Sequence, residues 1–87
     1  MKRDVLVRDM IEYINSDLGY PVELNEASSL SEDAGLDSLD ATDLISYMER
    51  KYDFKISDSE LSILKESIGD IVDFILNRLK NESQNIS

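Results

Sequence analysis

Apolar residues recur three or four positions apart in three segments of this chain, which is the spacing of one buried face of an α-helix. The segments cover residues 5–14, 38–52 and 68–79, and Asp4 is a candidate cap for the first. None of these helices could bury much surface alone, but their apolar faces together would form one core. The residues predicted to face inward are Leu6, Met10, Ile14, Ala41, Leu44, Ile45, Met48, Tyr52, Ile68, Ile71, Val72, Ile75 and Leu79.

A shorter helix is predicted between the last two segments, because Ser57 and Glu60 have the spacing of a capping box. The segment 19–37 contains Pro21 and a serine-rich run, and its scattered apolar residues predict a long loop that lies on the core. The expected fold class is therefore all-α. It is a small four-helix bundle with three longer helices, one short third helix, and a long loop between helices 1 and 2.

The length of 87 residues suits one small domain, which we place at residues 1–80. Residues 81–87 are polar and aperiodic, and we expect them to form a disordered tail. No run of about 18 apolar residues occurs, so no transmembrane helix and no membrane partner are predicted. Charged residues interrupt the segment after Lys2 and Arg3, which argues against a signal peptide and makes the cytoplasm the expected location.

The sequence contains neither cysteine nor histidine, and its 19 acidic residues outnumber nine basic ones to give a net charge of −10. These absences exclude disulfides, thiol nucleophiles, Cys/His metal sites and histidine-based triads. Without a nucleophile–base pair, we predict neither enzymatic activity nor a metal site. The negative charge argues against nucleic acid as a partner and favours a basic protein surface, unless the acids only keep the chain in solution.

The start of the second long helix is the most informative stretch. Asp37 can cap this helix with its carboxylate, and Ser38 would then lie in the first turn with its hydroxyl facing solvent. Unpaired N–H groups and the positive end of the helix macrodipole make that turn a favourable place for a phosphate ester. A serine at a helix start is also common without any further role, so the geometry alone leaves both interpretations open.

The run Gly35-Leu36-Asp37-Ser38-Leu39-Asp40 resembles the signature of the acyl carrier proteins, and the resemblance extends over residues 5–79. It implies that 4'-phosphopantetheine from coenzyme A is attached to Ser38, with Asp37 as the neighbouring acid. The arm would carry acyl groups as thioesters. The implied partners are a phosphopantetheinyl transferase and the enzymes of lipid or specialised acyl metabolism that load or transfer the acyl group. The carrier itself is expected to be a monomer.

Two further sites follow from the same resemblance. Partner enzymes with basic surfaces would dock at the start of the second helix, on the exposed Leu39 and the flanking acids Asp40 and Asp43. A cleft between the helices would shelter the acyl chain, whose exposure to water costs about 0.8 kcal/mol per CH₂. The candidate cleft residues, which could equally serve only as core, are Ile45, Met48, Ile56, Leu61 and Leu64.

The far half of the second helix departs from the family pattern. Carriers of fatty-acid synthesis usually have apolar residues at the positions of Thr42 and Ser46, and acids at the positions of Arg50 and Lys51. Because reversed charge weakens binding to a basic partner, we hypothesise a specialised carrier rather than the housekeeping one.

Two alternatives remain open at this stage. An aminoacyl or peptidyl carrier would use the same arm on Ser38, because the loading enzyme and not the carrier selects the cargo. An acidic protein-interaction module, with Ser38 serving only as a helix cap, belongs to a different class.

Overall fold

The chain folds into a helical bundle, and the computed structural model describes residues 2–85, with the backbone alone for residues 82–85. Within these residues no strand forms, and one isolated bridge pairs Ser29 with Ser67. The all-α prediction, with three longer helices and one short third helix, is confirmed. The elements are α1 (Arg3–Glu12), the π-helical turn η1 (Tyr13–Asp17), α2 (Ser38–Tyr52), the 3-10 helix η2 (Asp58–Lys65) and α3 (Ile68–Asn85).

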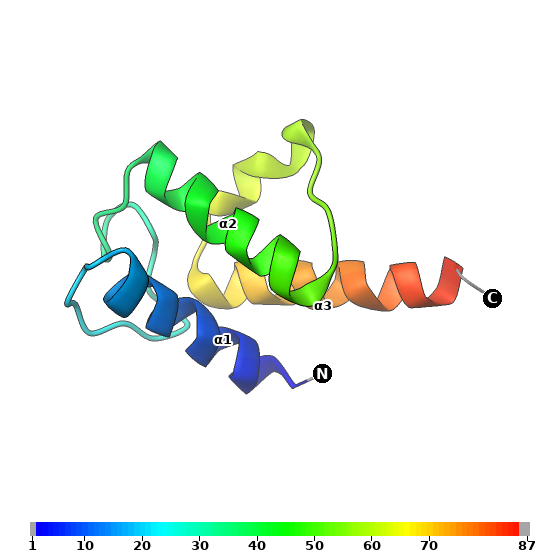
Figure 1. Cartoon of the computed structure of the whole chain (residues 1–87), viewed down its shortest axis with the longest axis horizontal. Helices are drawn as coiled ribbons and strands as arrows, with labels where there is room; N and C mark the ends of the chain where they lie inside the picture. The colour runs from blue at the N-terminus through cyan, green and yellow to red at the C-terminus, as the bar shows by residue number, and fades with distance from the viewer. Residues whose placement is uncertain (1, 86–87) are drawn as a thin grey trace.

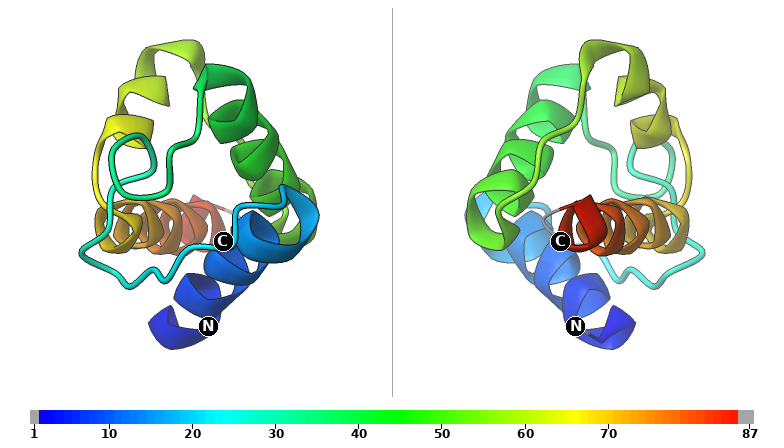
Figure 2. Two further views of the ribbon diagram at one scale, coloured as in Figure 1. Left: turned by 90° about the vertical axis from the view of Figure 1, so that its left-hand side faces the viewer. Right: turned by 90° about the vertical axis from the view of Figure 1, so that its right-hand side faces the viewer.

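The long loop and the start of α2 lie together at one end of the molecule (Figure 1). The two end views show α2 on one side and η2 on the other, with α3 seen almost end-on between them (Figure 2). The short helix therefore faces α2 across the bundle instead of extending α3.

The first helix begins earlier than predicted. Lys2 occupies the N-cap position, so the prediction that Asp4 caps this helix is wrong. Asp4 instead lies in the first turn, where its negative charge still complements the helix macrodipole. At the other end the helix continues through η1, and Gly19, with a φ of 79°, follows in the left-handed conformation that ends it.

The last two helices also differ in detail from the prediction. The capping box of Ser57 and Glu60 is present, with the Glu60 carboxylate accepting a hydrogen bond from the Ser57 N–H at 3.0 Å. The helix that it starts is a 3-10 helix, and none of its residues is fully buried. The final helix continues to Asn85 and so includes residues 81–85 of the segment predicted to form a tail. Residues 86–87 of the predicted tail lie outside the described residues.

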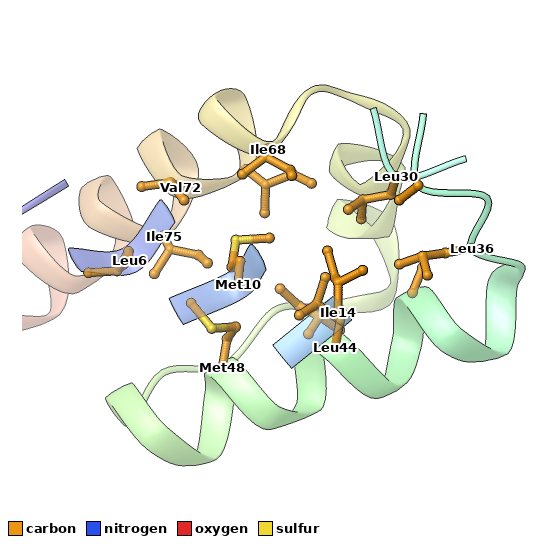
Figure 3. Close-up of a cluster of buried hydrophobic side chains, with 14 of the residues drawn as sticks. Leu6, Met10, Ile14, Leu30, Leu36, Leu44, Met48, Ile68, Val72 and Ile75 are labelled. Atoms are coloured by element: carbon orange, nitrogen blue, oxygen red, sulfur yellow. The ribbon is translucent and has the colours of Figure 1, made fainter. Parts of the chain in front are cut away.

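The core forms where the apolar faces of α1, α2 and α3 meet, and its side chains fill the space between the three ribbons (Figure 3). All the residues predicted to face inward are buried except Tyr52 and Leu79, which are half-buried against the core. The loop adds Leu30, Ala34 and Leu36 to the core, which confirms that this segment packs on the bundle. The helices and the loop therefore share one core.

Backbone hydrogen bonds fasten the long loop to the start of α3. The N–H groups of Ile68 and Gly69 donate to the carbonyls of Ser28 and Glu26, at 2.9 and 2.8 Å. A Cβ atom on Gly69 would lie 2.7 Å from the guanidinium of Arg3 and 3.0 Å from the Glu26 carbonyl oxygen. A glycine here, unfavourable inside a helix by itself, is thus explained by the close approach of the loop.

A polar cluster joins the last turn of α2 to α1. The carboxylate of Asp9 accepts hydrogen bonds from Tyr47 at 2.9 Å and from Tyr52 at 2.5 Å, and it pairs with Lys51 at 2.9 Å. The Tyr47 ring also stacks on Tyr13, with ring centroids 4.2 Å apart. Partial burial raises the pKa of Asp9, but the hydrogen bonds from Tyr52, Lys51 and Tyr47 lower it more, so it lies below the ordinary 3.8.

A second polar cluster fixes the beginning of η2 to α3. Arg78 donates to the Lys55 carbonyl at 2.6 Å and pairs with Glu60, while its guanidinium lies over the Phe74 ring at 5.4 Å. Glu60 in turn holds the Ser57 N–H of the capping box. One arginine therefore links α3 both to the connection before η2 and to the first turn of η2.

We predict that Asp9→Asn lowers the free energy of unfolding at pH 7 by about 1–3 kcal/mol, because a charged acceptor of three donors is lost. The folded-state pKa of Asp9 is lowered, so its stabilisation is present above the unfolded-state value of about 3.9 and is lost as the pH falls through the folded-state value. Urea unfolding should therefore show the difference between wild type and variant shrinking below about pH 4. Asp4→Asn, at an exposed position, is the control, and an unchanged difference at low pH would contradict the prediction.

We also predict that Arg78→Ala loosens η2 locally. The Lys55 carbonyl and Glu60 lose their partner, so hydrogen exchange of the amides in residues 57–65 should become about three- to tenfold faster. Amides of α1 should change much less. Lys80→Ala, which removes an exposed positive charge from the same helix, should leave residues 57–65 unaffected. Equal acceleration throughout the chain would mean that η2 opens only with the whole bundle.

Candidate functional site

Ser38 lies in the first turn of α2 because Asp37 ends the loop there. The Asp37 carboxylate accepts a hydrogen bond from the Asp40 N–H at 2.8 Å, which is the N-cap interaction predicted from the sequence. Gly35, two residues earlier, has a φ of 79°, a conformation that residues with a Cβ rarely adopt. The turn at Gly35 and the cap at Asp37 together set where the helix begins.

The Ser38 side chain is exposed, and its hydroxyl has no hydrogen-bond partner within the described part of the chain. Its carbonyl accepts a hydrogen bond from the Thr42 hydroxyl at 2.7 Å, one turn further along. The cap is Asp37 and not Ser38, so the serine hydroxyl is not needed to start the helix. The Ser38 hydroxyl is therefore exposed at a helix N-terminus without stabilising the fold, so it is available for chemical modification.

The predicted docking residues surround this hydroxyl but are not equally accessible. Leu39 is 80% exposed, and Asp43 is exposed as well. Asp40 is half-buried, because its carboxylate accepts a hydrogen bond from the Tyr20 hydroxyl of the long loop. This hydrogen bond, followed by partial burial, raises the pKa of Tyr20. The sequence offers no signal for the pair, since its members are 20 residues apart.

A groove with a volume of about 350 Å³ opens beside Ser38, between the start of α2, the long loop and η2. Of the five predicted cleft residues, Leu61 and Leu64 line this groove. Ile45 and Met48 do not, because the phase of α2 turns them into the core, where they are 3% and 0% exposed. Ile56 is half-buried outside the groove lining, with its N–H held by Glu49 at 2.8 Å. The lining residues are Leu30, Ser31, Leu36, Asp37, Ser38, Ala41, Thr42, Leu61, Leu64 and Lys65.

Sequence reasoning missed most of the groove wall. Leu30 and Leu36 are recognisable as apolar residues of the loop, but periodicity cannot place a loop residue in space. Lys65 could have been noticed as the one base between Lys55 and Arg78. The groove combines an apolar floor with a polar rim that includes the Ser38 hydroxyl.

Two general features bear on what this surface can do. Within residues 2–85, no three of the acidic side chains that the structure describes come close enough together to form a metal-binding group. None of the helices in that range has the length and apolar character needed to cross a lipid bilayer.

Comparison with known proteins assigns the family. Residues 8–75 match the family model described as "Phosphopantetheine attachment site". An acyl carrier protein of Chlamydia felis is 45% identical over 56 residues, which is 64% of this chain and 70% of that protein. One from Chlamydia caviae is 43% identical over 56 residues, covering 64% and 71%. One from Phenylobacterium zucineum is 34% identical over 70 residues, covering 80% and 84%. The chain therefore belongs to the acyl carrier protein family.

Proposed function

We propose that Ser38 is the attachment point of 4'-phosphopantetheine in this chain, and that the groove beside it receives part of the acyl cargo. Carriers of this family hold acyl groups and present them to other enzymes, and they are not catalysts themselves. The observation that carries the proposal is the exposed Ser38 hydroxyl in the first turn of α2, within the family match.

The residues around Ser38 fit a phosphate ester. The first turn of a helix presents unpaired N–H groups and a positive macrodipole end, both of which favour a phosphate. Because Asp37 already caps the helix, esterification of Ser38 would not remove a stabilising hydrogen bond. When attached, the arm supplies a terminal thiol that holds an acyl group as a thioester. The sequence has no cysteine to compete with that thiol.

The groove gives an apolar cargo a place out of water. Its floor consists of leucine and alanine side chains, and burial of each CH₂ there recovers about 0.8 kcal/mol. One wall belongs to η2, whose residues are at most half-buried. Elements with few buried contacts open most easily, so this wall can move to admit a longer chain.

Partner enzymes would approach the exposed face at the start of α2. The family implies a phosphopantetheinyl transferase and acyl-handling enzymes as partners. Leu39 and Asp43 are the accessible docking residues, while Asp40 is already engaged by Tyr20. A basic partner surface complements these acids, as the net charge of −10 suggests. A monomeric state and a cytoplasmic location stay predictions from the sequence.

The competing interpretations are weaker. The relatives are acyl carrier proteins, which favours acyl over aminoacyl or peptidyl cargo. The interaction-module alternative needed Ser38 as a helix cap, but Asp37 fills that role.

The two basic residues that depart from the pattern of the fatty-acid carriers differ in their surroundings. Lys51 pairs with Asp9 of α1, so its role is at least partly structural. Arg50 is exposed, and it makes no ion pair with any residue in the described part of the chain. The charge difference that supports a specialised carrier therefore rests mainly on Arg50, and the polar Thr42 and Ser46 remain as further departures from the family pattern.

We predict that incubation with coenzyme A and a broad-specificity phosphopantetheinyl transferase adds the arm to the wild-type chain and adds none to Ser38→Ala. Ser31→Ala, which changes another exposed serine of the groove rim, should be modified normally. Mass spectrometry of the intact protein and of its peptides measures both results. The melting temperature of Ser38→Ala should match wild type, because the cap is Asp37. Modification of Ser38→Ala, or none of wild type beside a carrier that is modified, would refute the proposal.

We also predict that Arg50→Glu raises the rate of elongation by a fatty-acid synthase set about two- to tenfold at low salt, because a base that repels a basic docking surface becomes an acid. Lys55→Glu makes the same charge change after the end of α2 and should have a smaller effect. Wild-type elongation as fast as that of the synthase's own carrier would remove the basis for a specialised role.

A further inference from the structure

Lys65 is the one base among the residues that line the groove beside Ser38. It is the last residue of η2, and it lines the same groove as Ser38, Ala41 and Thr42 from the first two turns of α2. Lys65 is exposed, and it forms no ion pair with any side chain that the structure describes. Its ammonium group is therefore free to bind an anion that appears at the groove mouth.

The surroundings of Ser38 are otherwise negative. Asp37 lines the groove, and Asp40 and Asp43 follow within the first two turns of α2. No base occurs between Arg8 and Arg50 in the sequence. A phosphodiester placed on Ser38 would add another negative charge to these acids, and the helix N-terminus offsets this only in part. A cation reaching the same groove would lower that repulsion.

We propose that the Lys65 ammonium group binds the phosphodiester that joins the arm to Ser38, an inference that rests on the proposed attachment at Ser38. Lysine suits this role because its ammonium is a compact point charge with three donors on a flexible four-carbon stem. The contact would place the arm along the groove mouth, above the leucine floor.

The way η2 is anchored favours this contact. Arg78 and Glu60 hold the first turn of η2 to α3. Lys65 lies at the opposite end, where the N–H of Ile68, three residues later, donates to the Ser28 carbonyl of the long loop at 2.9 Å. Lys65 also borders a second hollow of about 560 Å³, on the side of η2 that includes Phe74. Its side chain therefore lies at the boundary between two open spaces. Binding to the phosphodiester would therefore need a movement of the Lys65 side chain only, and it would hold the arm at the groove mouth.

The test compares apo and arm-bearing forms of wild type, Lys65→Ala, Lys65→Glu and Lys65→Arg. Lys55→Ala is the control, because it removes an exposed lysine from the connection before η2, which does not line the groove. Mass spectrometry first establishes that each protein carries the arm on Ser38. The readouts are the change in melting temperature when the arm is attached, at low and high salt, and the ³¹P chemical shift of the phosphodiester.

For wild type, attachment of the arm should raise the melting temperature by about 1–4 °C more than it does for Lys65→Ala. This difference should shrink at 1 M salt, where charges are screened within about 3 Å. The rise in melting temperature on attachment of the arm should be smaller for Lys65→Glu than for Lys65→Ala. Lys65→Arg should keep most of the wild-type rise, and Lys55→Ala should show all of it. The ³¹P shift should move in Lys65→Ala and Lys65→Glu only.

Three outcomes would overturn the proposal. Equal effects of the arm on wild type and Lys65→Ala, with an unchanged ³¹P shift, would mean that Lys65 does not bind the phosphodiester. An effect of Lys65 seen only after acylation would assign this lysine to the cargo instead. Failure to attach the arm to Ser38 would refute the proposed function and this inference together, and the mass measurement distinguishes that case from the first two.

Discussion

The hydrogen bond from the Asp40 N–H to the Asp37 carboxylate is the interaction on which the arrangement of the site depends. It fixes the residue at which α2 begins, while the spacing of the apolar residues fixes which side chains of that helix face the core. With this spacing, Ala41, Leu44 and Met48 face the core, while Ser38 and Leu39 face solvent. A start one residue later would leave this apolar face directed at α1 and α3, but it would take Ser38 out of the helix. The spacing of the apolar residues therefore directs Ser38 to solvent, and the cap places it in the first turn.

The three long helices are held by more buried contacts than the short helix η2. The long helices share a buried core, and the polar cluster around Asp9 adds a second link between α1 and α2. In contrast, η2 has no fully buried residue and is fastened to α3 by Arg78 at its beginning. A wall of this kind can move without disturbing the core, because the contacts that it breaks are few. The groove beside Ser38 is thus bordered by the helix whose displacement would break the fewest buried contacts.

The helices and their inward faces could be predicted from the sequence because both depend on local spacing, and the same holds for the Ser57 capping box. The groove could not be predicted in this way. Ile45 and Met48, which the sequence offers as candidate walls, belong to the core. Helix periodicity shows that a position is buried, but it does not show which neighbour that position meets. The remaining features of the site depend on contacts between residues that are far apart in the sequence. Leu30 reaches the groove from a loop without periodicity, and Asp40 is held by a tyrosine 20 residues away.

The acids near Ser38 are not neutralised by the bases that form ion pairs elsewhere in the structure. In the described part of the chain, the ion pairs join different elements, with the acids Glu26 and Asp73, Asp9, and Glu60 as their negative partners. The bases of those pairs are thus committed to the fold, away from the first turn of α2. The acids near Ser38 consequently lack compensation from those bases, and a basic surface of another protein can supply it. Exposed charge pairs between two proteins are individually weak and screened by salt, but the attraction between the two surfaces steers their encounter from a distance. Such encounters are fast to form and easily broken, which suits a carrier that must leave each enzyme for the next.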